Sequence, residues 1–412
     1  MAGFSISILM SIIMFMYLFF IAIFVAIILY LIISYTFEGI SIMCMGKKLK
    51  YKNIFTAWIP FYNKYVLGKI SNSKGMAIKI EEGGALNLGV DDGSIRYNSP
   101  IIEGKTTGVY NLGTFNFYDG VIRGKTAIDG GVTDTPKLYD PKVEQSGEMQ
   151  ESVLAKVTDV EATIGKTRYA TLEQAVDAAN NIKGTSADEI EIDIVVDLAK
   201  NAKVVMDNTK NIVLDLNGYT LTNTVADYVI ENQGKLKIID SSKTEEAEGT
   251  GIIKSTTSNT LLNSGTGELT IKGGTITTSV ASKNAIDIKE TSKVIVEDGA
   301  IVSAMSNGST GICIYDYGQA VINGGNISSN KYGVYNYKNG TIIINGGTII
   351  GNEYGIYNNL GQLLVTDGVI TGRYGGIKNN SEIRIINGEI SSLSNSGKNV
   401  IIENGMITGS IT

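Results

Sequence analysis

Carboxylates are the residues of this chain whose type could support general acid–base chemistry. Hydrolysis of a glycosidic bond needs two facing carboxylates, and a lyase needs clustered carboxylates for Ca²⁺ beside a basic residue. The candidates are dispersed, and those that adjoin glycines are expected to serve turns. We therefore predict no catalytic residue among Asp287, Glu297, Asp298, Asp316 and Asp367.

Other reactive side chains are scarce. The chain has no histidine, which excludes Ser-His-Asp mechanisms and His-ligated zinc. Arg373 and Arg384 are the only arginines after residue 286 and are the first suspects for a catalytic base. Cys44 and Cys313 lie too far apart for a CxxC motif, and a disulfide between them stays open. We predict no cofactor and no metal. The net charge of −6 makes nucleic acid an unlikely partner.

Tyrosines recur at regular intervals near the C-terminus. Tyr332, Tyr354 and Tyr374 are 22 and 20 residues apart, and Tyr335 and Tyr357 are 22 apart. Rings stacked from one repeat to the next would stabilise a fold by themselves. Rings that face solvent would instead offer a platform for sugars. The first three tyrosines are therefore the candidate glycan-binding residues.

A repeat governs the chain around these tyrosines. A turn glycine followed two residues later by isoleucine recurs at intervals of 25, 26, 22, 21, 20 and 17 residues, at Gly274, Gly299, Gly325, Gly347, Gly368, Gly388 and Gly405. Between these turns lie short apolar runs without a helical period. Such coils bury their apolar face by stacking about 4.8 Å apart in parallel.

Stacking places equivalent side chains above one another. The predicted inner ladder is Ile276, Ile301, Ile327, Ile349, Ile370, Ile390 and Ile407, with a second ladder of Val334, Ile356 and Ile377. Asn323 with Asn345, and Asn336 with Asn358, are expected to stack as amides.

A short amphipathic helix over 169–181 precedes the repeats. Leu172, Ala175, Val176 and Ala179 fall on one face, and Thr171 with Gln174 forms a capping box. We expect this helix to cover the N-terminal end of the stack.

The motif series resembles a group of Firmicutes cell-surface β-helix proteins. It runs from TRYATLEQAVDAANN through NIVLDLNGYTLTN to the Gly-Gly-x-Ile coils. The resemblance implies an all-β, right-handed parallel β-helix of the pectate-lyase-like fold over 151–412. Its motifs are structural and imply no activity.

Two further segments lie upstream. GVYNLGTFNFYDGVIRG within 76–132 matches the C-terminal coils and predicts a partial solenoid. Residues 133–150, with Pro136 and Pro141, are predicted to be a linker. At the other end of the chain, exposed strand edges and isoleucines near Thr412 predict self-association, or a longer protein of which this is a piece.

The first 35 residues are predicted to form a transmembrane anchor. Phe4 to Tyr35 carries no charge and is long enough to cross a bilayer. A basic and aromatic juxtamembrane segment follows over 36–75, and its AWIPFYNKYVLGKI stretch resembles the start of small Firmicutes membrane proteins. Lys47, Lys48, Lys50 and Lys52 favour a cytoplasmic C-terminal side, whereas the surface-protein resemblance favours an extracytoplasmic solenoid, which we expect.

Three functions follow from these observations. The first is a non-enzymatic, membrane-anchored surface solenoid with a structural, adhesive, or glycan- or protein-binding role. The second is a polysaccharide lyase or glycoside hydrolase. The third is a membrane-associated scaffold based on residues 1–72. We expect the first, because the carboxylates are dispersed and histidine is missing.

Overall fold

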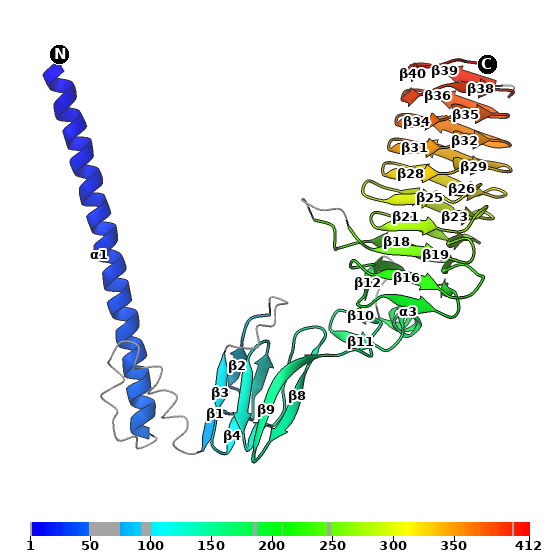
Figure 1. Cartoon of the computed structure of the whole chain (residues 1–412). Helices are drawn as coiled ribbons and strands as arrows, with labels where there is room; N and C mark the ends of the chain where they lie inside the picture. The colour runs from blue at the N-terminus through cyan, green and yellow to red at the C-terminus, as the bar shows by residue number, and fades with distance from the viewer. Residues whose placement is uncertain are drawn as a thin grey trace. The chain divides into compact units, whose positions relative to one another are not determined.

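The chain folds into two compact units, Met1–Val157 and Thr158–Thr412. The computed structural model describes residues 2–48, 75–91, 100–183, 188–207, 209–244, 249–397 and 399–412. Both units contain parallel strands stacked as a β-solenoid, about 12 turns in all (Figure 1).

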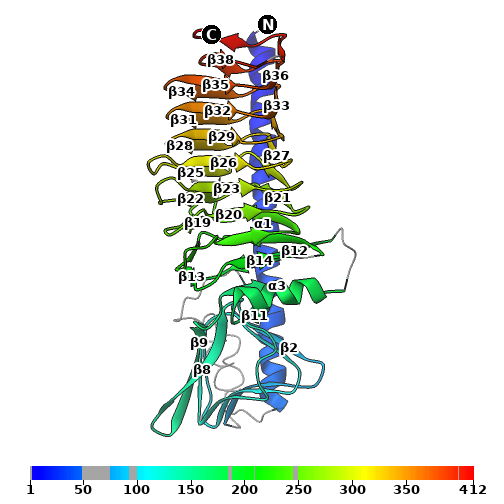
Figure 2. The same cartoon turned by 90° about the vertical axis from the view of Figure 1, so that its right-hand side faces the viewer.

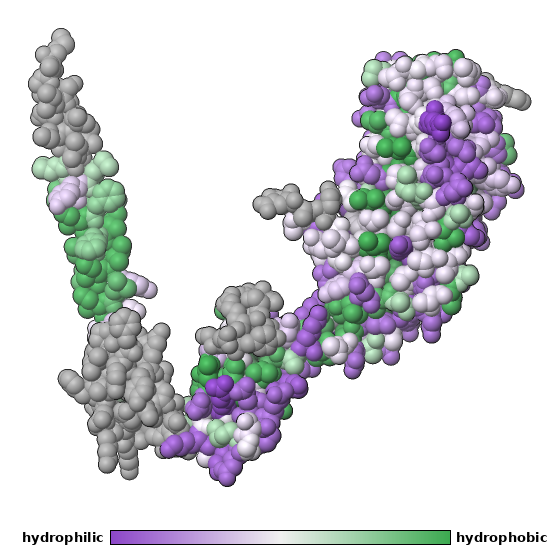
Figure 3. Space-filling model, in the orientation of Figure 1, coloured by the Kyte–Doolittle hydropathy of each residue, from purple (hydrophilic) through white to green (hydrophobic). Residues whose placement is uncertain are grey.

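The N-terminal helix α1 (Ala2–Lys48) is long, apolar and exposed. Its segment Met14–Phe37 has a mean hydropathy of 3.0 and none of it is buried; Figure 3 shows it as a green band. These 24 residues span about 36 Å at 1.5 Å per residue, enough for a bilayer core of about 30 Å. A membrane anchor and a signal sequence would both have such a helix. The helix ends at Lys48 and not at Tyr35 as predicted, since no proline interrupts Thr36–Lys48.

The remainder of the first unit is a small solenoid with its own core. Its parallel pairs are β1 (Met76–Ile80) with β4 (Thr107–Asn111) and β7 (Thr126–Asp129), β2 (Ala85–Leu88) with β5 (Thr114–Phe117), and β3 (Ile101–Glu103) with β6 (Val121–Gly124). Phe115 and Phe117 are fully buried and their rings stack 5.9 Å apart. The segment predicted as a partial solenoid thus contains two stacked turns.

The linker predicted over 133–150 is wrong for most of its length. Strands β8 (Tyr139–Ser146) and β9 (Met149–Lys156) form an antiparallel hairpin, and β9 pairs with β6. Leu154 from β9 is buried in the core of the first unit. Pro141 is tolerated because β8 lies at the edge of its sheet. The hairpin also moves the start of the second unit from 151 to Thr158.

Three sheets of parallel coil strands form the second unit, and each coil up to β38 contributes one strand to each sheet, while the last contributes only β39 and β40. Figure 2 shows the third sheet as a column of stacked strands. The first sheet contains β12 (Glu189–Ile194), β15 (Asn211–Asp215), β18 (Lys235–Ile239), β21 (Glu268–Ile271), β24 (Lys293–Val296), β27 (Gln319–Ile322), β30 (Gly340–Ile344), β33 (Gly361–Val365), β36 (Glu382–Ile385) and β39 (Asn399–Ile402).

The second sheet contains β13 (Leu198–Lys200), β16 (Thr220–Asn223), β19 (Ile252–Ser255), β22 (Thr275–Thr278), β25 (Ile301–Ala304), β28 (Asn326–Ser329), β31 (Thr348–Gly351), β34 (Val369–Gly372), β37 (Glu389–Ile390) and β40 (Met406–Ile407). The third sheet contains β14 (Val204–Met206), β17 (Ile230–Asn232), β20 (Leu261–Asn263), β23 (Asn284–Ile288), β26 (Thr310–Ile314), β29 (Tyr332–Asn336), β32 (Tyr354–Asn358), β35 (Gly375–Asn379) and β38 (Leu393–Asn395).

The register confirms the inner ladder with one correction. Ile276 is paired with Val302, and Val302 with Ile327, so Val302 and not Ile301 occupies this rung. Val302 is fully buried, whereas Ile301 is only partly buried and belongs to the neighbouring, outward column. The cause is one extra residue, Ala300, after the corner glycine of this coil. The second ladder, Val334 to Ile356 to Ile377, is as predicted.

Buried asparagines form a ladder inside the solenoid. The Asn336 side-chain amide donates to Asn358 Oδ1 at 3.1 Å, and Asn358 donates to Asn379 Oδ1 at 2.7 Å. All three residues are fully buried, and each also donates to a backbone carbonyl in its turn. The predicted pair Asn345 and Asn323 is also bonded, at 2.9 Å, on the exposed side of a corner.

Helix α3 (Leu172–Asn181) matches the predicted amphipathic helix. Thr171 is its N-cap, and the Thr171 side chain accepts a hydrogen bond from the backbone N–H of Gln174. The predicted apolar face is buried in the same core as the ladders. Lys200 in β13 makes 2.7 Å ion pairs with Glu173 of α3 and with Glu161. Beside α3, the short strands β10 (Ala162–Ile164) and β11 (Thr167–Tyr169) join the first sheet antiparallel.

We predict that Asn358→Ala costs at least about 2 kcal/mol of unfolding free energy, because it leaves buried amide partners above and below it unsatisfied. The matched control, Asn345→Ala, removes an exposed rung and should change stability by less than about 0.5 kcal/mol. Urea unfolding of residues 158–412 measures both. Equal losses for the two variants would contradict the role of the buried ladder.

Candidate functional site

The outer face of the third sheet carries most of the aromatic side chains of the solenoid. Four of its rings lie in β29 and β32, and the others lie in the turns after β26, after β29 and before β35, so the rings span four neighbouring coils. Consecutive coils lie about 4.8 Å apart, which is within ring-contact distance. We call this surface the tyrosine face and define it as Tyr315, Tyr332, Tyr335, Tyr337, Tyr354, Tyr357 and Tyr374.

The rings of the tyrosine face form two sets of contacts. Tyr335 and Tyr357 are stacked with their centroids 5.1 Å apart, and Tyr332 contacts both of these rings at 5.2 Å. Tyr337 lies 5.9 Å from Tyr335 and from Tyr315, which completes a cluster of five rings. Tyr354 and Tyr374 form a separate pair, and Lys378 lies over one ring of each set.

A column of glycines holds the tyrosines in this position. Gly333 and Gly355 precede the inward Val334 and Ile356, and each occupies a place without room for a side chain. A Cβ on Gly333 would lie 2.5 Å from Ile349 Cγ2, and one on Gly355 would lie 2.7 Å from Ile370 Cγ2. The strand therefore passes close to the second sheet, and tyrosines on both sides of each Gly-aliphatic pair face outward.

Two of the three predicted glycan-binding residues are equivalent in the structure, and the third is displaced. Tyr332 is paired with Tyr354 in the register, and both are half-buried. Tyr354 is paired with Gly375, so Tyr374 lies one residue before the equivalent position. Tyr374 is 63 % exposed, and its ring still contacts Tyr354 at 6.2 Å. All three belong to the tyrosine face.

Sequence reasoning missed the cations around these rings. Lys378 Nζ lies 4.8 Å from the Tyr357 ring centroid and 5.7 Å from that of Tyr354. Lys331 lies 5.0 Å from the centroid of Tyr332. Arg373 Cζ lies 5.9 Å from the centroid of Tyr374. Lys378 takes the register position of Tyr357 in the next coil, which a 21-residue alignment of the repeats could have revealed.

Burial changes the titration of the central tyrosines. Desolvation raises the pKa of Tyr335 to about 12, with a smaller contribution from Tyr357. Desolvation also raises the pKa of Tyr332, and the neighbouring Glu353 carboxylate adds to this effect. The hydroxyls therefore stay protonated at neutral pH and can donate hydrogen bonds.

A buried carboxylate lies on the same sheet, three coils before the Tyr354 coil. Asp287 is 1 % exposed and accepts hydrogen bonds from Tyr228 Oη at 2.7 Å and from the amides of Asn259 and Asn284 at 2.8 Å. Burial raises the pKa of Asp287 in spite of these donors. Cys313, next to Asp287 in the register, is a free thiol, and burial raises its pKa to about 12. Cys44 is also free.

The other predicted carboxylates lie in the corners. Asp367 Oδ1 accepts the backbone N–H of Gly368 at 2.8 Å, and Glu297 accepts the Asn323 amide at 3.1 Å. Asp316 is exposed in the turn after β26, where it has a positive φ of 58°. Arg384 is paired with Glu403 on the first sheet. Asp367 therefore serves its turn, as predicted, and Glu297 bonds to the corner of the next coil, whereas Asp316 lies beside Tyr315 of the tyrosine face.

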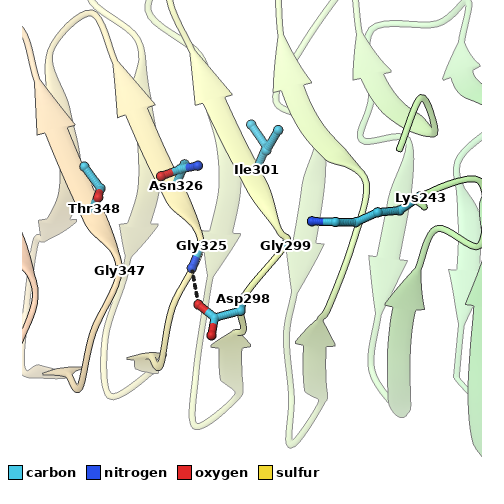
Figure 4. Close-up of a pocket in the computed structure, with 8 residues that line it drawn as sticks. All are labelled: Lys243, Asp298, Gly299, Ile301, Gly325, Asn326, Gly347 and Thr348. Atoms are coloured by element: carbon cyan, nitrogen blue, oxygen red, sulfur yellow. Dashed lines mark hydrogen bonds between the residues drawn. The ribbon is translucent and has the colours of Figure 1, made fainter. Parts of the chain in front are cut away.

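Asp298 lines a groove of about 370 Å³ at the corner between the first and second sheets. Figure 4 shows that Asp298 Oδ1 accepts the backbone N–H of Gly325 at 3.4 Å. Ile301, the residue displaced from the predicted ladder, lines this groove beside Asn326. Lys243 reaches toward it from an earlier coil (Figure 4).

A cluster of three acidic residues in the first sheet could hold a cation. Glu191, Asp193 and Asp215 each offer a carboxylate oxygen, and these oxygens lie within 4.8 Å of one another. Asp215 also accepts the backbone N–H groups of Asn217 and Ser241 at 2.8 and 2.9 Å, so it has a structural role in its turn.

No protein-family model, curated protein or solved structure matches this chain. The resemblance to surface β-helix proteins is therefore supported only as a parallel β-solenoid with an N-terminal apolar helix.

We predict that raising the pH from 9 to 11 destabilises the solenoid in part through Tyr335. Its folded pKa of about 12 exceeds the ordinary value of about 10, so the unfolded chain loses this proton first. The stabilisation is complete below about pH 10 and is lost as the pH rises toward 12. Urea unfolding at the two pH values measures the loss of unfolding free energy, and Tyr335→Phe should make this loss smaller. Tyr317→Phe, at an exposed turn, should leave the loss unchanged. An equal reduction by both variants would contradict a specific contribution of Tyr335.

Proposed function

We propose that this protein is anchored in a bacterial membrane by α1 and displays a solenoid that binds a glycan through the tyrosine face, without catalysing a reaction. The observation that carries the proposal is the group of seven partly exposed rings on one sheet, a cluster of five beside a pair. Aromatic rings supply rigid apolar area at a small cost in side-chain entropy, and their hydroxyls add polar contacts.

Polar groups at one edge of the face support binding of a polyhydroxylated ligand. Asn380 donates to Tyr357 Oη at 3.0 Å, and Tyr357 Oη donates to Asn359 Oδ1 at 3.2 Å. Asn359 and Asn380 are partly exposed, so their remaining hydrogen-bonding capacity faces solvent. Apolar rings beside amides form the mixture that sugar recognition requires.

The alternative is a polysaccharide lyase or glycoside hydrolase. Arg373 at the face and Asp287 on the same sheet would be its first candidate residues. Asp287 is buried and accepts hydrogen bonds from three neutral donors, which favours a structural role. Formation of an unsaturated uronate, detected by its absorbance, would establish lyase activity and overturn the non-catalytic proposal.

Two further features of the fold are proposed: the handedness of the coil and the capping role of α3. We infer a right-handed coil from the resemblance of the repeats to β-helix proteins, and we infer that α3 acts as the cap of the stack. Burial of the apolar face of α3 supports the second inference. An experimental structure tests both.

We predict that the double variant Tyr354→Ala/Tyr374→Ala lowers affinity for a bound glycan at least tenfold, since two aromatic contacts of about 1 kcal/mol each are removed. Glycan arrays with the full chain in detergent identify the ligand, and biolayer interferometry measures the affinity. Tyr317→Ala is the matched control, because Tyr317 is exposed in a turn outside the tyrosine face. Unchanged affinity of the double variant would refute this binding surface.

We predict that the solenoid is extracytoplasmic and remains in the membrane fraction. Lys47 and Lys48 at the end of α1 oppose this topology, but large domains are translocated in spite of flanking charge. Protease treatment of intact cells should digest the solenoid. Digestion only after lysis would refute the topology, and release of the solenoid into the medium would show that α1 is a signal sequence.

We further propose self-association through the C-terminal coil. Val400, Ile402 and Ile411 are exposed there, although the ladders that they continue are buried in earlier coils. Open strand edges and exposed apolar residues favour pairing with a second copy. Sedimentation of residues 158–412 should show a concentration-dependent dimer, and Val400→Lys/Ile402→Lys should abolish it. A monomer at high concentration would contradict this proposal.

A further inference from the structure

We propose that the ligand of the tyrosine face is an anionic glycan, with carboxylate or phosphodiester groups that repeat along its length. This inference rests on the proposed glycan binding and adds the charge of the ligand. It starts from a contrast: the chain as a whole has a net charge of −6, yet three cations lie over the rings of this face.

The cations of the face are held by rings and not by carboxylates. Lys331 and Lys378 lie over tyrosine rings within 5.0 Å, and Arg373 lies over Tyr374. Within the described part of the chain, none of these three has a carboxylate within ion-pair distance. A cation on a ring keeps its charge available, whereas a cation in an ion pair does not.

Two carboxylates near the rings are engaged by neutral donors. Asp287 is buried and accepts hydrogen bonds from Tyr228 and two asparagine amides. Glu353 interacts with the Tyr332 hydroxyl. A third, Asp316, is exposed in the turn after Tyr315, three coils before Lys378. Lys331, Lys378 and Arg373, which lie over rings, present positive charge to a ligand that lies there.

The cations also recur along the solenoid. Lys289 follows β23 and lies 5.8 Å from the Tyr315 ring centroid; Lys331 precedes β29, and Lys378 lies in β35. These strands are two places apart in the third sheet. At about 4.8 Å per strand, the three lysines are offset by roughly 10 Å along the axis. Lys331 lies before the start of its strand and Lys289 after the end of its strand, so the positive charges are also spread across the width of the sheet. Charge spread over this length matches a polymer with repeated negative groups better than a compact anion.

The test measures binding of the full chain in detergent micelles to immobilised polymers. The probes are polygalacturonate and hyaluronate, the methyl esters of both, and poly(ribitol phosphate). We expect a charged polymer to bind at least tenfold more tightly than an uncharged ester, and this binding to weaken between 50 and 200 mM salt as screening increases. Preference for a uronate or for the phosphodiester identifies the anionic group.

Lys331→Gln/Lys378→Gln should lower affinity for the charged polymer about tenfold, as expected for two partly exposed ionic contacts, and should leave binding to the ester unchanged. Lys254→Gln/Lys272→Gln, outside the third sheet, is the matched control. Circular dichroism verifies that each variant is folded. Equal affinity for charged and esterified polymers overturns the anionic inference and leaves glycan binding intact. Failure to bind every charged polymer also overturns it, and the neutral-glycan array then decides the proposed function separately.

Discussion

The hydrogen bonds between coils determine the rest of this structure. Every strand of a parallel stack bonds to the coil before it and the coil after it, so each coil must repeat the register of its neighbours. Side chains of one kind then lie above one another: isoleucines and valines inward, asparagines in the turns, and tyrosines outward. The residue type can still change along a column: the column of Tyr335, Tyr357 and Lys378 begins with the buried Asp287 and Cys313.

The same constraint explains why a binding surface forms on this fold. A flat parallel sheet brings residues 20 or more positions apart to within 5–6 Å of one another, as the contacts of Tyr335 with Tyr357 and of Tyr354 with Tyr374 show. The glycines at 333 and 355 keep the backbone close to the second sheet, so the tyrosines before and after them share one face. The site is therefore a property of the repeat and not of a specialised loop.

The repeat made much of the fold predictable, and local departures from the repeat account for the errors. The corner glycines and the apolar face of α3 are determined by residue type and spacing. Ile301 is displaced because Ala300 adds one residue to its corner, and Tyr374 because its coil spans 21 residues whereas the tyrosine spacing is 20. The hairpin of β8 and β9 was missed because β8 is polar and contains Pro141. Alignment of the repeats could place Lys378 at the position of Tyr357, but spacing alone does not show that its side chain lies over the rings.

The stacking of coils has a mechanical consequence. Neighbouring coils are joined by the hydrogen bonds of their paired strands. A pulling force along the axis acts on the bonds between one pair of coils at a time, so coils separate one after another. A force on a ligand across the tyrosine face is instead shared by several coils at once. The solenoid should therefore resist a load from its side better than a load along its axis.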